Sequence, residues 1–374
     1  MNPRDAQVMV VGAGIAGLAL ARTLRQRQIT TVVVDRAVGP PDAGLALNLP
    51  GNAVRALSLV GVGDDIESIG EPVRRREYRS ANDRIVFAID EDAFWGDVGR
   101  SRCVLRRDLF ELLVSDLPAD TVRWGSAVTS ARTTGEGVEV VLADGAIERC
   151  ALLIGADGVH STVRSAVFGD SAPRSALLSA ASWRFMALNP GVHCWTAWTG
   201  KLATFLLIPV DSDTVYGFGS ATRGGPVDAD PEWLRSAFGD FPPPVQDVVG
   251  EVLDDRSTLY HSPLEEVRVP HWTHDRVILI GDAAHATTPV WAQGAAMAVE
   301  DAVVLAELIA THDDWSRIGP QYERRRRPRI GHVQAMTDRL SRAAKLPGWI
   351  RNTIYPFVGP RTYRETYGPL KTAP

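Results

Sequence analysis

The chain has 374 residues, which is long enough to bury a large core and to form two domains. Its 45% hydrophobic and 23% charged residues are typical of an ordinary globular protein, and a net charge of -5 argues against general nucleic-acid affinity. The sequence contains no stretch suited to stable membrane insertion. The cysteines, Cys103, Cys150 and Cys194, are few and scattered, so they predict no metal site and fit a cytoplasmic location.

The first predicted elements form a βαβ unit around a glycine motif, G-x-G-x-x-G, whose glycines are Gly12, Gly14 and Gly17. An apolar strand at 8–11 precedes the motif, and a helix at 18–28 and a strand at 31–34 follow it. The second strand ends at Asp35, roughly 20 residues past the motif, where an acid can accept a ribose hydroxyl. This spacing predicts a dinucleotide site with the pyrophosphate at the helix N-terminus.

Two alternatives apply to this unit. The uncharged run at 8–21 could be the core of a signal peptide, but Arg4 and Asp5 before it give no net positive start, so secretion is not favoured. The motif alone also leaves open whether the site holds NAD or FAD.

Further along the chain, a loop at 38–50 and a short helix at 52–60 precede two strands at 75–80 and 84–89. A helix is predicted at 106–117, followed by strands at 122–130, 138–142 and 146–150. The last two strands are joined by the turn Asp144-Gly145. A separate apolar strand at 151–154 leads into Gly155-Ala156-Asp157-Gly158, and Ser161 is suited to cap the next helix.

The second half begins with strands rich in aromatic residues at 183–188, 195–198, 203–208 and 215–219, which predict a mostly antiparallel sheet. Helix and loop follow at 231–250, with a break at the three prolines 242–244. A buried strand at 277–280 then precedes Gly281-Asp282, and a long helix is predicted at 295–310. The arginine run at 324–327 is predicted to be a solvated helix face.

Three strand-to-loop motifs, in this order and spacing, resemble the single-component FAD-dependent aromatic hydroxylases, a family that includes 4-hydroxybenzoate, salicylate and 6-hydroxynicotinate hydroxylases. They are the N-terminal glycine motif, Gly155 to Ser161 with Arg164, and Gly281 to His285 with Pro289 and Gly294. Arg106 with Asp108 is also similar to the arginine motif by which this family contacts the flavin. The resemblance covers roughly residues 8–329.

The resemblance implies an FAD cofactor. The residues that it places at FAD are Gly12, Gly14, Ala16, Gly17, Asp35, Arg36, Arg106, Asp157, Gly158, Gly281, Asp282, Pro289, Gly294 and Ala295. Taken singly, Asp157 and Asp282 could instead be helix caps and Arg164 a surface ion pair, and we expect His285 to be structural. The helix at 295–310 is expected to point its positive N-terminus at the flavin ring.

One loop departs from the family pattern. Many relatives read Pro-x-x-Gly-Gln-Gly-x-Asn, whereas this chain has Ala292 at the first glycine and Ala296 at the asparagine. The variant resembles the hydroxylases of salicylate and 6-hydroxynicotinate.

The resemblance also implies a monooxygenase that consumes NADH or NADPH and O₂, and that hydroxylates or epoxidises an aromatic or polycyclic small molecule through a flavin C4a-hydroperoxide. Because no second glycine motif follows a strand, NAD(P)H is expected to dock transiently. Tyr216, Arg184 and His193 are the candidates for a polar substrate contact or a catalytic base. About half of the sheet aromatics should face away from the flavin, and Trp291 could form a wall of the substrate pocket.

Two other functions stay open: a flavin-dependent halogenase, although 195–198 lacks its Trp-x-Trp-x-Ile-Pro segment, and an FAD protein that binds a metabolite without turnover. A homodimer is one of the oligomeric states left open. The predicted fold is α/β, with a Rossmann-like FAD-binding domain and an inserted antiparallel substrate domain. The predicted FAD-binding segments are 1–71, 101–175 and 269–340, the substrate segments are 72–100 and 176–268, and 341–374 is a helical tail.

Overall fold

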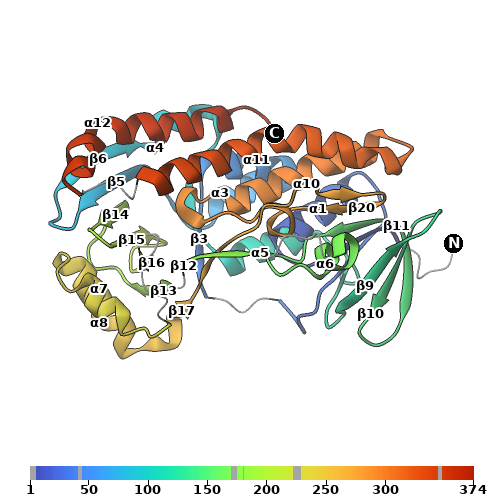
Figure 1. Ribbon diagram of the computed structural model, residues 1–374, viewed down its shortest axis with the longest axis horizontal. Helices are drawn as coiled ribbons and strands as arrows, with labels where there is room; N and C mark the ends of the chain where they lie inside the picture. The colour runs from blue at the N-terminus through green and yellow to red at the C-terminus, as the bar shows by residue number, and fades with distance from the viewer. Residues whose placement is uncertain (1–5, 41–43, 170–174, 180, 222–228, 344–347) are drawn as a thin grey trace.

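The computed structural model describes residues 6–40, 44–169, 175–179, 181–221, 229–343 and 348–374 (Figure 1). Its largest sheet has the order β19-β20-β11-β1-β2-β8, with β10 and β9 added beside β11. These strands are β1 (Ala6–Val11), β2 (Thr31–Val34), β8 (Val122–Arg123), β9 (Val128–Thr133), β10 (Val138–Leu142), β11 (Ile147–Gly155), β19 (Thr273–His274) and β20 (Val277–Leu279).

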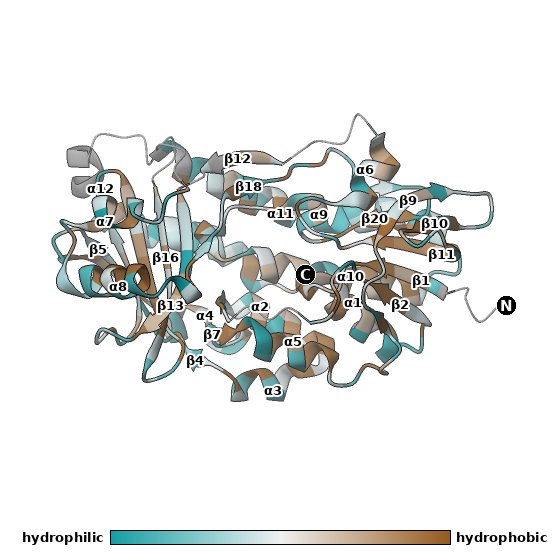
Figure 2. Cartoon of the chain, turned by 90° about the horizontal axis from the view of Figure 1, so that it is seen from below, coloured by the Kyte–Doolittle hydropathy of each residue, from teal (hydrophilic) through white to brown (hydrophobic). Residues whose placement is uncertain are grey.

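The centre of this sheet is parallel, and its carboxyl ends are aligned. Val11 of β1 pairs with Gly155 of β11, which in turn pairs with Leu279 of β20. The three predicted motifs follow these strand ends, so the register alone brings the motifs to one edge of the sheet. The parallel parts of the central strands are mainly apolar (Figure 2), as expected for a sheet buried on both faces.

Strand β11 corrects one prediction. The sequence predicts separate strands at 146–150 and 151–154, whereas the structure has a single strand. Its first half pairs antiparallel with β10, and its second half pairs parallel with β1 and β20. The alternating pattern of the first half and the continuous apolar run of the second reflect burial on one face and then on two.

Helices cover the large sheet and form one hydrophobic core with it. α1 packs against α10, and α10 packs in turn against α11. The helices are α1 (Ile15–Gln26), α5 (Arg106–Val114), α6 (Thr162–Phe168), α9 (Asp282–His285), α10 (Gly294–Thr311) and α11 (Ile318–Ala343).

The second sheet has the order β17-β13-β16-β15-β14-β5-β6. Its strands are β5 (Arg75–Ser80), β6 (Ile85–Asp90), β13 (Ser182–Leu188), β14 (Trp195–Thr199), β15 (Ala203–Pro209), β16 (Thr214–Ala221) and β17 (Tyr260–His261). Helices α7 (Trp233–Phe238) and α8 (Pro243–Asp254) cover one face and enclose a separate core (Figure 1). The run of three prolines is the start of a helix as well as a break. Pro243 and Pro244 begin α8, where their missing N–H groups cost nothing.

Short elements join the two sheets. β3 (Ala46–Leu49) and β7 (Arg102–Leu105), with β4 (Glu71–Pro72), form a small sheet that the sequence analysis did not predict. These strands are too short for a reliable alternating pattern. The other connecting elements are β12 (Ala176–Ser179), β18 (Leu264–Glu266), α2 (Gly51–Leu57), the π-helix η1 (Ser58–Val62), α3 (Gly63–Ser68) and α4 (Glu91–Trp95).

The last helix, α12 (Gly348–Tyr367), lies along β6 at one side of the molecule (Figure 1). Its C-terminal part is anchored by Tyr363, whose hydroxyl donates to the buried Glu91, and Glu91 also pairs with Arg76. Within the described ranges, no helix is long and apolar enough to cross a membrane, and no group of acidic, histidine or cysteine residues could hold a metal ion.

The arginine run on α11 is only partly the solvated face that the sequence predicts. Arg324 and Arg325 are exposed, but Arg326 is 0% exposed. The Arg326 guanidinium pairs with Glu300 at 2.9 Å and with Asp301 at 2.7 Å, both on α10. The prediction was wrong for this residue because its partners lie on a neighbouring helix that no local pattern identifies.

Candidate active site

The glycine motif after β1 forms a tight turn that leaves a cradle open. Gly12 has a φ of +107°, and a Cβ atom there would lie 2.4 Å from the carbonyl oxygen of Ala156. A Cβ on Gly17 would lie 2.0 Å from the Gly12 carbonyl oxygen. Gly14 is exposed and has no atom near its absent side chain, and it precedes α1, which has no capping side chain. The turn therefore offers unpaired backbone N–H groups to an anion.

Asp35 links this turn to the loop after β2. One oxygen of its carboxylate accepts from the backbone N–H of Ala13 at 2.6 Å, and the other accepts from Ala37 at 2.8 Å. Each oxygen retains a lone pair, so the carboxylate can still accept ribose hydroxyls beside the open turn. Arg36 next to it is exposed.

The loop after β11 is built around a helix cap. The Asp157 carboxylate accepts from the hydroxyl of Ser161 at 2.5 Å and from the backbone N–H of Thr162 at 2.7 Å. Ser161 in turn accepts from the backbone N–H of Arg164, as the sequence predicts for a cap. The Asp157 side chain is thus engaged in the fold, and a cofactor contact from this turn would come from the backbone around Gly158, which is partly exposed.

Arg164 does not form the surface ion pair that the sequence analysis considered as an alternative. Its side chain is buried, and its guanidinium donates to the carbonyl oxygens of Ala283 at 2.8 Å and Val159 at 2.6 Å. These two carbonyl groups belong to the second and third motifs. Arg164 therefore fixes the position of one motif relative to the other.

The third motif places a free carboxylate at the same edge. Gly281 has a φ of +58°, and a Cβ there would lie 3.0 Å from the Cβ of Ala16 at the start of α1. The Asp282 side chain that follows is accessible and makes no hydrogen bond or ion pair with the described residues. Burial by the surrounding protein nevertheless raises the pKa of Asp282. The carboxylate is therefore reachable from solvent but close to surrounding protein atoms.

A buried charge network supports this third motif from behind. Asp301 accepts from the backbone N–H of Gly281 at 2.9 Å and binds Nε2 of His285 at 2.6 Å. Its other oxygen accepts from Arg326 at 2.7 Å. Both carboxylate oxygens of Asp301 and the His285 ring are buried, so His285 is structural, as expected.

The loop between the third motif and α10 is held from two sides. The side-chain amides of Gln293 and Asn52 bond reciprocally, at 3.0 and 3.2 Å, and the Tyr367 hydroxyl donates to the Trp291 carbonyl at 2.6 Å. Ala292, which replaces a family glycine, still adopts the left-handed conformation with a φ of +51°. The alanine thus occupies a conformation that ordinarily favours glycine.

The N-terminus of α10 faces open space. The loop begins at Pro289, and Gly294 and Ala295 start a helix of 18 residues that has no capping side chain. The nearest atom to a Cβ built on Gly294 is an Asp282 carboxylate oxygen, at 4.0 Å. The uncapped N-termini of α1 and α10 are thus both directed to the region of Asp282 and the glycine turn.

Two arginines without partners lie next to Asp282. Arg106 begins α5 and Arg184 lies on β13, and neither guanidinium makes a hydrogen bond or ion pair within the described part of the chain. Burial lowers the pKa of Arg106, and the neighbouring Arg184 lowers it further. Both arginines also interact electrostatically with Tyr216 of β16. Burial raises the pKa of Tyr216, so its phenol stays protonated and can donate a hydrogen bond.

The three candidates for a substrate contact or a catalytic base do not all lie together. Arg184 pairs in register with Phe218, and Tyr216 with Met186, so Arg184 and Tyr216 lie on the same face, opposite α7 and α8. His193 lies in the exposed loop before β14 and bonds to no described residue. As expected for strands, the aromatics divide between the two faces, with Trp183, Trp198 and Phe205 in the α7–α8 core and Trp195 on the other face.

The sequence analysis missed the polar residues that support the site: Asn52, Gln293, Glu300, Asp301 and Arg326. The signal for two of them is visible afterwards, because Glu300 and Asp301 lie within an apolar run of the helix. A charged pair in a buried helix requires a partner, but the sequence does not say which arginine supplies it.

These features fit an extended, anionic cofactor such as FAD. The open cradle at Gly14 and the uncapped N-terminus of α1 suit a pyrophosphate, and Asp35 suits a ribose. The α10 N-terminus suits a ring that takes up negative charge. The Nε atom of Arg184 is buried and has no partner, as expected if a bound molecule completes the site.

The comparisons with known proteins agree with one another. Residues 5–337 match the family model "FAD binding domain". The chain is 29% identical to 2-heptyl-3-hydroxy-4(1H)-quinolone synthase of Pseudomonas aeruginosa, covering 98% of this chain and 97% of that protein. It is 33% identical to 3-amino-4-hydroxybenzoate 2-monooxygenase of Streptomyces cremeus, covering 93% and 90%. The structure of Klebsiella pneumoniae HpxO with FAD and uric acid has a TM-score of 0.83 at 26% identity, covering 98% and 95%.

Proposed function

The chain belongs to the FAD binding domain family, and from that premise we propose that it hydroxylates an aromatic small molecule at the expense of NAD(P)H and O₂. Its cofactor is FAD, and it is an FAD-dependent monooxygenase, as the sequence predicted. Neither the family match nor these relatives favour a halogenase. We also propose the predicted division of the chain, with FAD-binding segments that alternate with substrate segments.

The observation that supports this function most strongly is the pair of unpaired guanidinium groups beside Tyr216. Arg106 and Arg184 place two positive charges at the edge where the three FAD motifs meet, without a carboxylate partner of their own. An unpaired charge is costly to bury, so the arrangement favours a ligand that supplies negative charge. FAD phosphates can satisfy Arg106, and Arg184 then faces an acidic oxygen of the substrate.

Each residue can be given a role on this basis. Arg184 binds a phenolate or carboxylate oxygen of the substrate, and the protonated Tyr216 donates a hydrogen bond beside it. Because His193 is exposed, we keep it as a candidate base only at the entrance of the substrate site. The second sheet covers the reacting region and excludes water. FAD supplies electron transfer from NAD(P)H and the activation of O₂.

The direct test is a screen of aromatic acids and phenols for stimulated NAD(P)H oxidation by the FAD-loaded protein, with the product mass recorded. We expect stimulation by aromatic compounds with an ionisable oxygen and a product heavier by one oxygen atom. NAD(P)H consumption that yields only hydrogen peroxide with every compound would contradict the proposal. Binding of such compounds without any NAD(P)H consumption would favour the metabolite-binding alternative.

A further inference from the structure

A cavity lies between the second sheet and the C-terminal helices α11 and α12. Arg184 is not among the residues that line it. Its volume is about 160 Å³. The walls are aromatic and aliphatic side chains from several separate segments of the chain. They include Tyr78 and Phe87 of β5 and β6, Trp195 of β14, Trp291 of the loop before α10, Leu340 of α11 and Val358 of α12.

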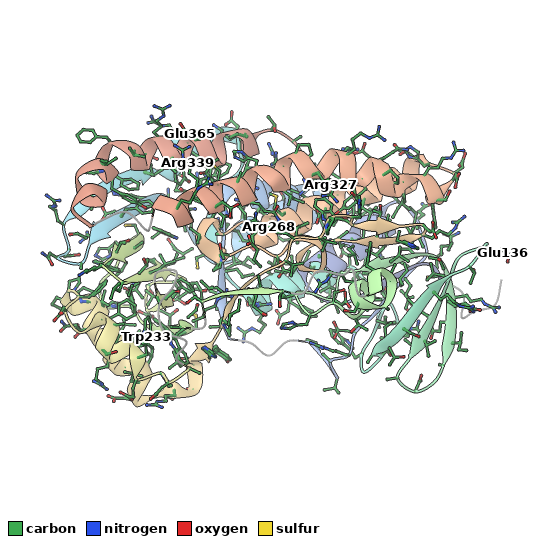
Figure 3. The ribbon with its side chains drawn as sticks, viewed as in Figure 1. Glu136, Trp233, Arg268, Arg327, Arg339 and Glu365 are labelled. Atoms are coloured by element: carbon green, nitrogen blue, oxygen red, sulfur yellow. The ribbon has the colours of Figure 1, made fainter. Side chains whose placement is uncertain are left out.

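This cavity is suited to a group without charge. The rings of Tyr78 and Phe87 stack with centroids 4.2 Å apart, and the Trp195 ring lies 5.0 Å from that of Tyr78. The charged residue at the rim is already neutralised, because Arg339 of α11 bonds to Glu365 of α12 at 2.6 Å (Figure 3). A charged ligand would find no free counter-ion among these wall residues, whereas an apolar ligand loses nothing on entering.

The cavity lies on the same face of the second sheet as the proposed reaction site. Tyr216, Ile208 and Trp195 belong to one buried hydrophobic cluster on that face. Strands β16 and β14 are separated by β15 alone, so Tyr216 and Trp195 lie roughly 10 Å apart across the sheet at the usual strand spacing. Trp291 brings the wall of the cavity to the loop that precedes α10.

The mouth of the cavity is apolar as well. Val290, Ile354 and Val358 are 47%, 45% and 39% exposed, although all three are aliphatic and lie around one opening. Exposed aliphatic side chains that line a single pocket indicate a binding site for apolar groups.

We propose that the substrate is amphiphilic: its aromatic, acidic end lies at Arg184 and Tyr216, and an unbranched alkyl chain on that ring lies in the cavity between Trp195, Trp291 and α12. The inference rests on the proposed function, since it names the substrate class of the same site. It also assigns a role to α12, which forms one wall of the cavity and holds the loop before α10 through the bond from Tyr367 to Trp291.

The probe is a series of 2-hydroxy-4-n-alkylbenzoates, from methyl to heptyl, titrated calorimetrically into the FAD-loaded protein. If the chain enters the cavity, each added methylene should lower Kd about fourfold until the cavity is full. A Kd that does not depend on chain length would overturn the inference.

Two filling variants locate the chain. Val358→Trp at the mouth and Leu340→Phe on the opposite wall should abolish the dependence on chain length while Kd for the methyl compound is unchanged. The matched control is Phe357→Trp, because Phe357 neighbours Val358 on α12 but is 81% exposed and does not line the cavity. It should bind as the native protein does. A dependence on chain length that survives in both filled proteins would place the chain elsewhere and overturn the inference.

The outcomes for this inference and for the proposed function can be separated. Hydroxylation of these benzoates without any effect of chain length would contradict the alkyl site alone. Chain-dependent binding without NAD(P)H oxidation or oxygenated product would support the alkyl site and contradict the proposed reaction.

Discussion

The carboxylate of Asp301 accepts a hydrogen bond from the backbone N–H of Gly281 at 2.9 Å, from inside the protein. Gly281 begins the turn that carries Asp282, so a buried residue of α10 sets the position of an accessible one. The same carboxylate binds His285 and Arg326. The shape of this turn therefore depends on buried charges behind it.

The first prediction concerns this support. Asp301→Asn leaves Arg326 with one fewer anion and weakens the bond to His285, so it should lower the free energy of unfolding by about 3–5 kcal/mol, as for a broken buried pair. Urea unfolding at neutral pH measures this loss. Asp313→Asn on the following exposed loop is the control and should have little effect. Unchanged stability of the Asp301 variant would mean that the network is not needed.

Asp301 also predicts how stability depends on pH. Although burial opposes it, the charges of His285 and Arg326 lower the pKa of Asp301 to about 2. Because the folded pKa lies below the unfolded value, the carboxylate stabilises the protein above the ordinary aspartate pKa of about 4. This contribution should be lost as the pH falls from about 4 to 2, and the Asn variant should lack that part of the acid dependence.

Gly294→Val tests whether the start of α10 contacts the flavin. Apart from its chain neighbours and the backbone of its own helix, no atom of the described residues lies closer than 4.0 Å to a Cβ at Gly294, so the side chain should be tolerated by the fold. A clash would come from the cofactor. We expect a normal melting temperature with lower FAD content or slower reduction by NAD(P)H. Gly331→Val on exposed α11, which also has open space around it, controls for the helical cost of valine. Normal FAD content and reduction in the Gly294 variant would place the flavin elsewhere.

Arg184→Gln tests the proposed substrate contact. The loss of a charge-assisted hydrogen bond of about 1.5–3 kcal/mol should raise KM roughly 10- to 100-fold for an acidic substrate. FAD content should stay the same, because Arg184 is assigned to the substrate and not to the cofactor. Arg184→Lys should restore part of the affinity. If acidic and uncharged substrates lost affinity equally, the assigned charge interaction would be wrong.

Ala292→Gly should stabilise the protein. An alanine at a φ of +51° is in the left-handed conformation, which costs roughly 1–2 kcal/mol relative to glycine. Part of the gain is offset by the greater entropy of glycine in the unfolded chain. We therefore expect a small rise in melting temperature without a change in FAD content. A lower melting temperature would show that the Ala292 methyl group contributes packing that outweighs the strain.

The sequence predicted the three motif turns well because each motif lies within a few residues of a strand end. Gly12, Gly17 and Gly281 could be placed from local geometry, and the alignment of β1, β11 and β20 then brings them together. The Asp157 side chain shows the limit of this reasoning. The sequence left open whether this carboxylate contacts FAD or caps a helix, and the structure shows that it bonds to the start of α6.

The remaining features depend on contacts between distant segments. Arg326 pairs with residues of another helix, and Asn52 bonds to Gln293 far along the chain. The cavity beneath α12 also combines residues from β5 to α12. Local periodicity carries no information on such partners, so the sequence predicted a solvated arginine run and an unspecified helical tail in their place.

The most direct measurement of the central claim combines cofactor identification with isotope labelling. The purified protein should be yellow and release FAD on denaturation. With NAD(P)H, an aromatic acid that stimulates its oxidation and ¹⁸O₂, the product should gain one labelled oxygen atom. A protein that binds FMN or cannot be reconstituted with FAD, or a product whose added oxygen comes from water, would contradict the account.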